Sequence, residues 1–133
     1  MDKSLKDLSN RRLEQAEQCI RSAKLLIEND DYKGAANRSY YAIFHCMRSV
    51  LALEQVDFKK HSGVSSYFRN QYIKTRVFDS KLSDIIADAF EIRNDSDYND
   101  FFVISKEDVE QQIQNAELFY NTVKNYLSLL NIE

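Results

Sequence analysis

The chain has 133 residues, of which 44% are apolar and 29% charged, and its net charge at pH 7 is −3. This balance is typical of a folded globular protein, and we expect one domain over residues 1–133. The acidic surplus argues against a protein that binds nucleic acid strongly and indiscriminately, because such proteins usually carry a basic surplus. There is no proline and there are two glycines, which disfavours a fold of many hairpins and favours long helices.

The N-terminal stretch MDKSLKDL has no apolar signal core, and no run approaches the roughly 20 apolar residues of a membrane span. Cys19 and Cys46 lie far apart and match no ligand spacing, which predicts two reduced thiols packed as small hydrophobic side chains. We therefore expect a cytoplasmic protein without a metal or a cofactor.

Periodic apolar residues predict a first helix over about residues 4–29. Its stripe recurs at alternating steps of three and four, at Leu13, Ala16, Ile20, Ala23 and Ile27. Ser4 with Asp7 resembles a capping box at the start of this helix. The sequence NDD at residues 29–31 then interrupts the stripe, and either aspartate can cap the helix that follows.

Further helical patterns follow along the chain. A second helix covers about residues 32–55, and its apolar face carries Tyr32, Ala36, Tyr40, Ile43, Met47 and Val50. A short helix over about residues 62–72 comes next. A fourth helix starts near residue 79, with an apolar face of Leu82, Ile85, Ile86, Ala89 and Phe90.

The last helix has the clearest pattern in the chain. Ser105 and Asp108 form a second capping box, followed by a stripe at Val109, Ile113, Ala116, Tyr120, Val123, Leu127 and Leu130. No segment alternates with period two for long enough to propose a sheet. Four long amphipathic helices with short connections predict an all-α fold, an antiparallel four-helix bundle with one additional short helix across one end.

Three stretches stand in order along these helices: NRSYYAIFH at residues 37–45, HSGV at residues 61–64 and RNDSDYNDF at residues 93–101. Their order and helical context resemble the HEPN domain family, in particular its stand-alone branch with SYYAxFH-like and RNxxDYxDF-like motifs. The resemblance covers nearly the whole chain. It implies a homodimer that brings two copies of the fourth-helix motif together, and a minimal nucleotidyltransferase as partner, in a toxin–antitoxin pair or as a nucleotide-binding partner.

Many proteins of that family are metal-independent ribonucleases that use an Arg, a polar residue and a following His. Here Arg93 and Asn94 match the start of that pattern, but Tyr98 stands where the histidine is expected, and no histidine follows His61. A histidine exchanges protons near neutral pH, whereas a tyrosine with a pKa of about 10 is a poor general base at pH 7. This departure weakens the ribonuclease interpretation.

Arg93 has two interpretations from sequence. It can complement the dipole at a helix C-terminus or pair with Asp95 or Asp97, or its guanidinium can bind a phosphate. In the second case we expect Asn94, Asp97 and Tyr98 to support the site. Tyr98 could also carry a hydroxyl that a nucleotidyltransferase partner modifies.

The aromatic and imidazole side chains of the first two motifs also have alternatives. Tyr40 and Tyr41 are expected to pack in the core with bonded hydroxyls, or to send one hydroxyl to Arg93. His45 either flanks the core or flanks the same cleft as Arg93. His61 is expected in the loop or cap before the short helix, and the two histidines do not make a metal site.

The charges are unevenly distributed. Residues 58–78 contain no acid but five bases, at Lys59, Lys60, Arg69, Lys74 and Arg76, with Tyr67, Phe68 and Tyr72 between them. In residues 79–108 the acids predominate. The two segments could pair with each other, across a dimer or with a partner protein, or the basic one could bind RNA or a nucleotide through Lys59, Lys60 and Arg69.

Two functions remain. The first is a non-catalytic or weakly active module that dimerises and binds a nucleotidyltransferase-type partner, a nucleotide or an RNA phosphate. The second is a divergent metal-independent ribonuclease, toxin-like, that uses Arg93 with Tyr98 or His45. The missing histidine favours the first.

Overall fold

A computed structural model describes residues 2–130 of the chain. The helices are α1 (Lys3–Glu28), α2 (Tyr32–Ala52), α3 (His61–Phe68), a π-helical turn η1 (Arg69–Ile73), α4 (Lys81–Tyr98) and α5 (Lys106–Leu130). Within residues 2–130 there is no β-strand. The predicted all-α fold with a short additional helix is therefore confirmed.

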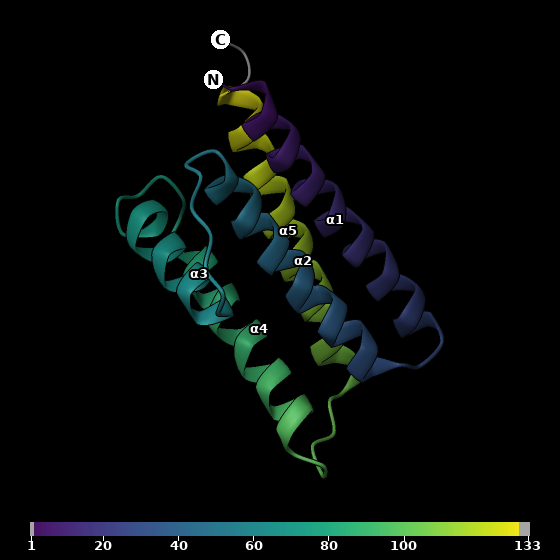
Figure 1. Cartoon of the computed structure of the whole chain (residues 1–133). Coiled ribbons are helices and arrows are strands. Elements are labelled where there is room, and N and C mark those ends of the chain that lie inside the picture. Colours follow the sequence, from purple (N-terminus) through teal and green to yellow (C-terminus); the bar gives the residue numbers. More distant parts are fainter. Residues whose placement is uncertain (1, 131–133) are drawn as a thin grey trace.

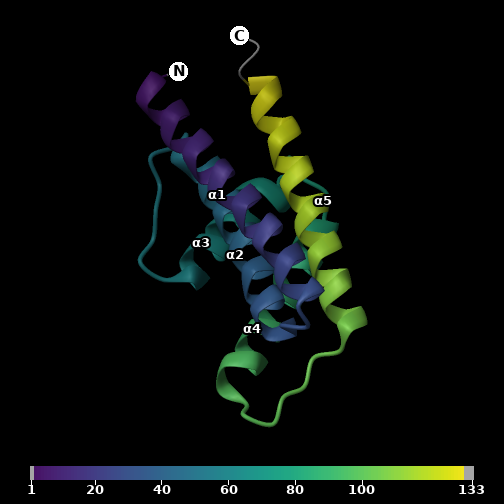
Figure 2. The ribbon, with the colours of Figure 1, turned by 90° about the vertical axis from the view of Figure 1, so that its right-hand side faces the viewer.

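The four long helices run antiparallel to their neighbours in the chain (Figure 1). α1 begins and α5 ends at the same end of the bundle, and the loop from α4 to α5 lies at the opposite end (Figure 2). α2 packs against α1, α3, α4 and α5. The side chains of α2 therefore determine much of the core and of the neighbouring surface.

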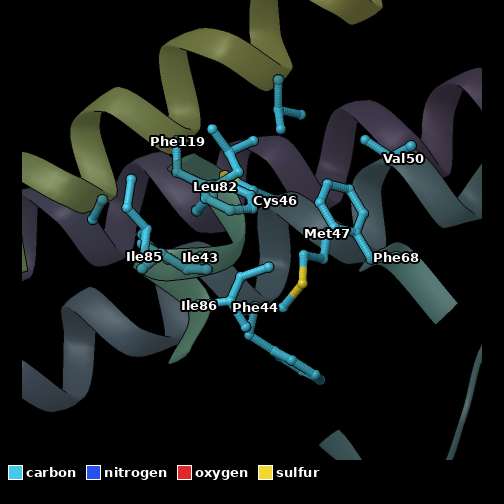
Figure 3. Close-up of a cluster of buried hydrophobic side chains, with 14 of the residues drawn as sticks. Ile43, Phe44, Cys46, Met47, Val50, Phe68, Leu82, Ile85, Ile86 and Phe119 are labelled. Carbon is cyan, nitrogen blue, oxygen red and sulfur yellow. The ribbon is translucent and has the colours of Figure 1, made fainter. Parts of the chain in front are cut away.

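The main core forms where α2 meets α3, α4 and α5. Ile43, Met47 and Val50 of α2 are almost fully buried, and Phe68, Leu82 and Phe119 reach the same cluster from the other helices (Figure 3). A smaller second cluster ties the α4–α5 loop to the bundle, through Ala23, Ala35, Ala36, Ile104, Val109 and Ile113. Both cysteines are buried free thiols, as the sequence predicted.

Side-chain caps determine where several helices begin. The predicted capping box at Ser4 is wrong, because Asp2 is the N-cap of α1 and its carboxylate accepts from the Ser4 backbone N–H at 2.7 Å. Asp31 caps α2 by accepting from the Gly34 N–H at 2.8 Å. Ser105 accepts from the Asp108 N–H at 3.1 Å, which confirms that half of the second box.

Three predictions at the helix ends and faces need correction. α2 ends at Ala52 rather than near residue 55, where Gln55 adopts a positive φ of 58°. The short helix ends at Phe68 and continues as the π-helical turn. Phe90 is 46% exposed, so the buried face of α4 stops at Ala89.

No helix within the described residues is long and apolar enough to cross a membrane.

Candidate functional site

A polar stripe runs along the half-exposed side of α2. Its members are Asn37, Arg38, Tyr41, His45 and Arg48, and each is partly accessible to solvent. Residues three and four apart share one face of a helix, which places these side chains on successive turns. The opposite side of α2 is buried in the main core, so the stripe is the part of this helix that a ligand can reach.

Arg93 of α4 extends to this stripe from the neighbouring helix. Its guanidinium carbon lies 4.7 Å from the ring centroid of Tyr40 and 5.5 Å from that of Tyr41. Nη2 of Arg93 donates a hydrogen bond of 3.3 Å to the Tyr41 hydroxyl. The alternative that a tyrosine hydroxyl reaches Arg93 is confirmed for Tyr41, whereas Tyr40 packs in the core.

Arg93 also forms an ion pair within α4. Its Nε lies 3.5 Å from Oδ2 of Asp97, one turn further along the helix, as one of the sequence interpretations predicted. The same Nε is buried and makes no hydrogen bond, because the carboxylate is not aligned with its N–H. The Arg93 side chain as a whole keeps 26% of its surface exposed.

His61 lies closer to this cluster than the sequence suggested. It is the first residue of α3, its Nδ1 is 3.0 Å from the Tyr40 hydroxyl, and its ring centroid is 4.1 Å from that of Phe44. Burial, with the nearby charges of Arg93 and Arg48, lowers the pKa of His61 below its usual value. A neutral His61 can accept the Tyr40 proton at Nδ1.

His45 is held neutral by its surroundings. Burial, followed by the charges of Arg48, Arg38, Arg12 and His61, lowers the pKa of His45 from 6.5 to about 4. Its Nδ1 is buried and has no hydrogen-bond partner within residues 2–130. The low pKa therefore reflects burial first, and the arginine charges along the stripe second.

Arg38 is held differently from the other arginines of the cluster. Its Nε and Nη2 donate to the Asn37 amide oxygen at 3.2 and 2.8 Å, and its guanidinium carbon lies 5.0 Å from the Tyr41 ring centroid. Arg48, by contrast, pairs with Asp57 at 2.8 Å. The sequence analysis did not single out Arg38, although it lies inside the NRSYYAIFH motif.

A model of the HEPN domain matches residues 9–126 of this chain. The chain belongs to the HEPN domain family.

Three relatives extend this assignment. A protein of Methanocaldococcus jannaschii named “Putative toxin MJ0142” is 33% identical over 120 residues, which cover 90% of this chain and 82% of the relative. A “UPF0332 protein” of Thermotoga maritima is 32% identical, with 84% and 85% covered. “Putative toxin MJ0605”, also of Methanocaldococcus jannaschii, is 30% identical, with 96% and 94% covered.

The rest of the HEPN fourth-helix motif lies at the end of α4. Tyr98 is the last residue of that helix and is 82% exposed, and Asn94 is exposed as well. Among the described residues, no hydrogen bond joins either side chain to Arg93. Of the expected supporting residues, Asp97 is therefore the one that contacts Arg93, and the roles of Asn94 and Tyr98 stay predictions.

The basic segment of this HEPN domain does not form one uniform patch. Lys59 and Lys60 are exposed before α3, but Arg69 donates a hydrogen bond of 3.1 Å to the Ser83 carbonyl of α4. Tyr67 and Tyr72 direct their hydroxyls to Glu54. No ion pair within residues 2–130 joins this segment to the acids of residues 79–108.

The described residues contain no group of three or more His, Cys, Asp or Glu side chains that could hold a metal ion. The side chains of the HEPN site offer guanidinium, phenol and imidazole groups. These groups can bind an anion, stack on a base, or transfer a proton.

Proposed function

We propose that this HEPN protein is a toxin-type module that dimerises and binds a phosphate of RNA or of a nucleotide through Arg93, without cleaving RNA efficiently. The observation that carries the proposal is the setting of Arg93. Its guanidinium lies near the rings of Tyr40 and Tyr41 and donates a hydrogen bond to the Tyr41 hydroxyl, and the side chain is partly exposed.

An arginine held in this way suits a phosphate. Its guanidinium is permanently charged and offers donors in a planar fork that matches phosphate oxygens. The contacts with the two rings restrict its rotamers, so less conformational entropy is lost on binding. Asp97 neutralises it only in part, because the ion pair is 3.5 Å long and the carboxylate is 41% exposed.

The expected lack of efficient cleavage rests on the histidine that is missing from the fourth-helix motif. General acid–base catalysis typically contributes about 10²- to 10⁴-fold in rate and requires a group within reach of the substrate proton. No histidine follows Arg93 in the motif, and Tyr98 is exposed without a hydrogen bond to Arg93. The Nδ1 atom of His45 is buried.

A nucleotidyltransferase-type protein is the proposed partner. This part of the proposal rests on the family resemblance and on the names of two relatives as toxins, since a toxin acts together with an antitoxin. A reading frame for a minimal nucleotidyltransferase beside this one in the genome would support the pairing, and co-purification of the two products would test it.

The binding test compares two single-charge variants. Titration of a fluorescent single-stranded RNA at low salt should show weaker binding by Arg93→Gln than by wild type, roughly tenfold or more, because a charge-assisted hydrogen bond is lost. Arg11→Gln is the matched control, since Arg11 is exposed on α1 away from the site. Equal binding by wild type and both variants would refute the proposal.

The structure also favours a specific form of the second function. His61 lies beside Tyr40 and Phe44 and near Arg93, and its lowered pKa leaves it able to accept a proton at pH 7. A metal-independent ribonuclease built on Arg93 would therefore use His61 rather than Tyr98 or His45. Cleavage of RNA in the presence of a chelator, lost in both Arg93→Gln and His61→Gln, would establish this alternative.

A further inference from the structure

Arg38 is the arginine of the stripe that is oriented without an acidic partner. Its Nε and Nη2 donate to the amide oxygen of Asn37, at 3.2 and 2.8 Å, and its Nη1 donates to Sγ of Cys19 at 3.9 Å. An amide fixes the guanidinium plane but does not cancel its charge. Within residues 2–130, Arg12 and Arg48 pair with Asp57 and Arg93 with Asp97, whereas no carboxylate pairs with Arg38.

Arg38 and Arg93 meet at a single ring. Their guanidinium carbons lie 5.0 and 5.5 Å from the centroid of Tyr41, one from α2 itself and one from α4. An anion that binds both guanidinium groups is attracted by both charges. Burial lowers the pKa of His45, one turn from Tyr41, and the charges of Arg48 and Arg38 add to that effect.

We propose that Arg38 is a second phosphate-binding residue, and that Arg38 and Arg93 together bind a terminal phosphate group rather than an internal phosphodiester. This inference rests on the proposed function and adds the kind of phosphate. A phosphomonoester carries between about −1.5 and −2 charges at pH 7, with three oxygen acceptors. An internal phosphodiester carries one negative charge, so it gains less from a second guanidinium.

The same phosphomonoester occurs on a free nucleotide and at the end of an RNA strand. Tyr41 and the other half-exposed side chains of the stripe extend along α2, so bases attached to the phosphate have a surface to lie on. The test must therefore separate the two sources of the terminal phosphate.

Calorimetric titration of the full chain with four unlabelled ligands makes that separation. One ligand is adenosine monophosphate. The other three are the same short single-stranded RNA with a 5′-phosphate, with a 3′-phosphate, and with no terminal phosphate. We expect at least one phosphorylated form to bind roughly tenfold or more tightly than the unphosphorylated strand. Binding of adenosine monophosphate with similar affinity would identify a nucleotide as sufficient, whereas its failure to bind would assign the site to RNA ends.

Arg38→Gln should abolish the preference for the terminal phosphate while changing the affinity for the unphosphorylated strand by no more than about twofold. Arg38→Lys keeps the charge but not the fork, and should retain part of the preference. Arg11→Gln should behave as wild type. Circular dichroism of each variant checks that the helices are intact, and Arg38→Lys keeps the test decisive if Arg38→Gln does not fold.

Two outcomes separate this inference from the proposed function. If Arg93→Gln weakens RNA binding but Arg38→Gln matches Arg11→Gln, the proposed function holds and the role of Arg38 is refuted. Equal affinity for phosphorylated and unphosphorylated ligands also refutes it. If no ligand binds the wild type, the proposed function is refuted together with this inference.

Discussion

Tyr41 connects the two helices of the candidate site through a single hydroxyl. It accepts from Arg93 at 3.3 Å while its ring lies near Arg38. Removing the hydroxyl in Tyr41→Phe deprives a half-buried guanidinium of this acceptor, and we expect the free energy of unfolding to fall by about 1 kcal/mol. Urea denaturation followed by circular dichroism measures the change.

The matched control for this prediction is Tyr98→Phe, which removes an exposed hydroxyl without a hydrogen bond among the described residues. Its stability should equal that of the wild type within about 0.5 kcal/mol. An equal loss in both variants would show that the Tyr41 hydroxyl contributes nothing specific.

His45 makes the stability of the protein depend on pH. Its pKa is about 4 in the folded chain and 6.5 in its ordinary environment, so the unfolded chain binds the proton more tightly. The free energy of unfolding should therefore fall as the pH decreases from about 7, and the loss should level off below about pH 4.

The comparison of wild type with His45→Gln isolates this effect, because His61 and the carboxylates titrate in both proteins. Between pH 7 and pH 5 the wild type should lose about 1 kcal/mol more than the variant, a figure reduced for partial solvent screening. Parallel stability curves for the two proteins over this range would contradict the assigned environment.

The candidate site was only partly visible at the level of single residues. Arg93 was singled out by its place in the RNDSDYNDF motif, and a hydroxyl of Tyr40 or Tyr41 reaching it was one of two alternatives. The bond between His61 and Tyr40 joins residues 21 positions apart and depends on how α3 turns back onto α2, which no local pattern encodes. The sequence did not single out Arg38. Its lack of an acidic partner becomes visible only in the folded structure.

At the scale of helices, caps decide where an element begins. Asp31 accepts the Gly34 N–H at 2.8 Å at the start of α2, the helix on which the site is built. Asp31→Ala should lower the free energy of unfolding by about 1 kcal/mol, since an orphan N–H loses its acceptor. Asp31→Asn keeps an oxygen acceptor and should stay within about 0.5 kcal/mol of wild type. Chemical denaturation of both variants decides the point, and equal stability of the two would contradict the cap.

The basic segment separates into structural and exposed cations. Arg69 anchors the π-helical turn to α4 through the Ser83 carbonyl, so Arg69→Gln should lower the free energy of unfolding by about 1–2 kcal/mol.

Changing Lys59 and Lys60 together to Gln should leave the free energy of unfolding unchanged but flatten the salt dependence of RNA binding. Thermal denaturation measures the stability of both variants, and RNA titrations at several salt concentrations measure the binding of the lysine variant. An RNA affinity of the lysine variant that matches wild type at every salt concentration would exclude these residues from the interface.

The sequence predicted the presence of each helix correctly but placed the helix ends less accurately. Apolar stripes with steps of three and four identified every long helix, because burying one face is what stabilises it. The start of α1 was misplaced by the pattern of Ser4 and Asp7, although Asp2 is an equally good cap chemically and lies earlier. The exposure of Phe90 could not be foreseen, since its position at the edge of the buried face depends on the angle at which α4 packs.

At the scale of the whole molecule, the end of α4 and the loop after it expose several large apolar side chains. Tyr98, Phe101 and Val103 are 82%, 93% and 86% exposed. Such a surface is costly in water unless something covers it, and the proposed homodimer would use it. We expect light scattering at micromolar concentration to give a dimer mass for wild type and a monomer mass for Phe101→Glu.

Leu129→Glu is the control for the dimer test. Leu129 is 67% exposed near the end of α5, at the opposite end of the bundle from the α4–α5 loop (Figure 1). The Leu129→Glu substitution adds the same negative charge as Phe101→Glu but lies outside the proposed interface, so this variant should remain a dimer. A monomer mass for the wild type would refute the homodimer outright.

The order of the helices along the chain has a consequence for how the protein is made. α1 and α2 form a helical hairpin closed by the short turn at residues 29–31, and the two helices lie side by side along most of their length (Figure 1). Contacts between neighbouring segments close cheaply and early. During synthesis the ribosome therefore releases this hairpin, with its cationic stripe, before α4 has emerged. Arg93 reaches Tyr41 only later, so the contact that joins the two halves of the candidate site forms only when α4 docks on the hairpin.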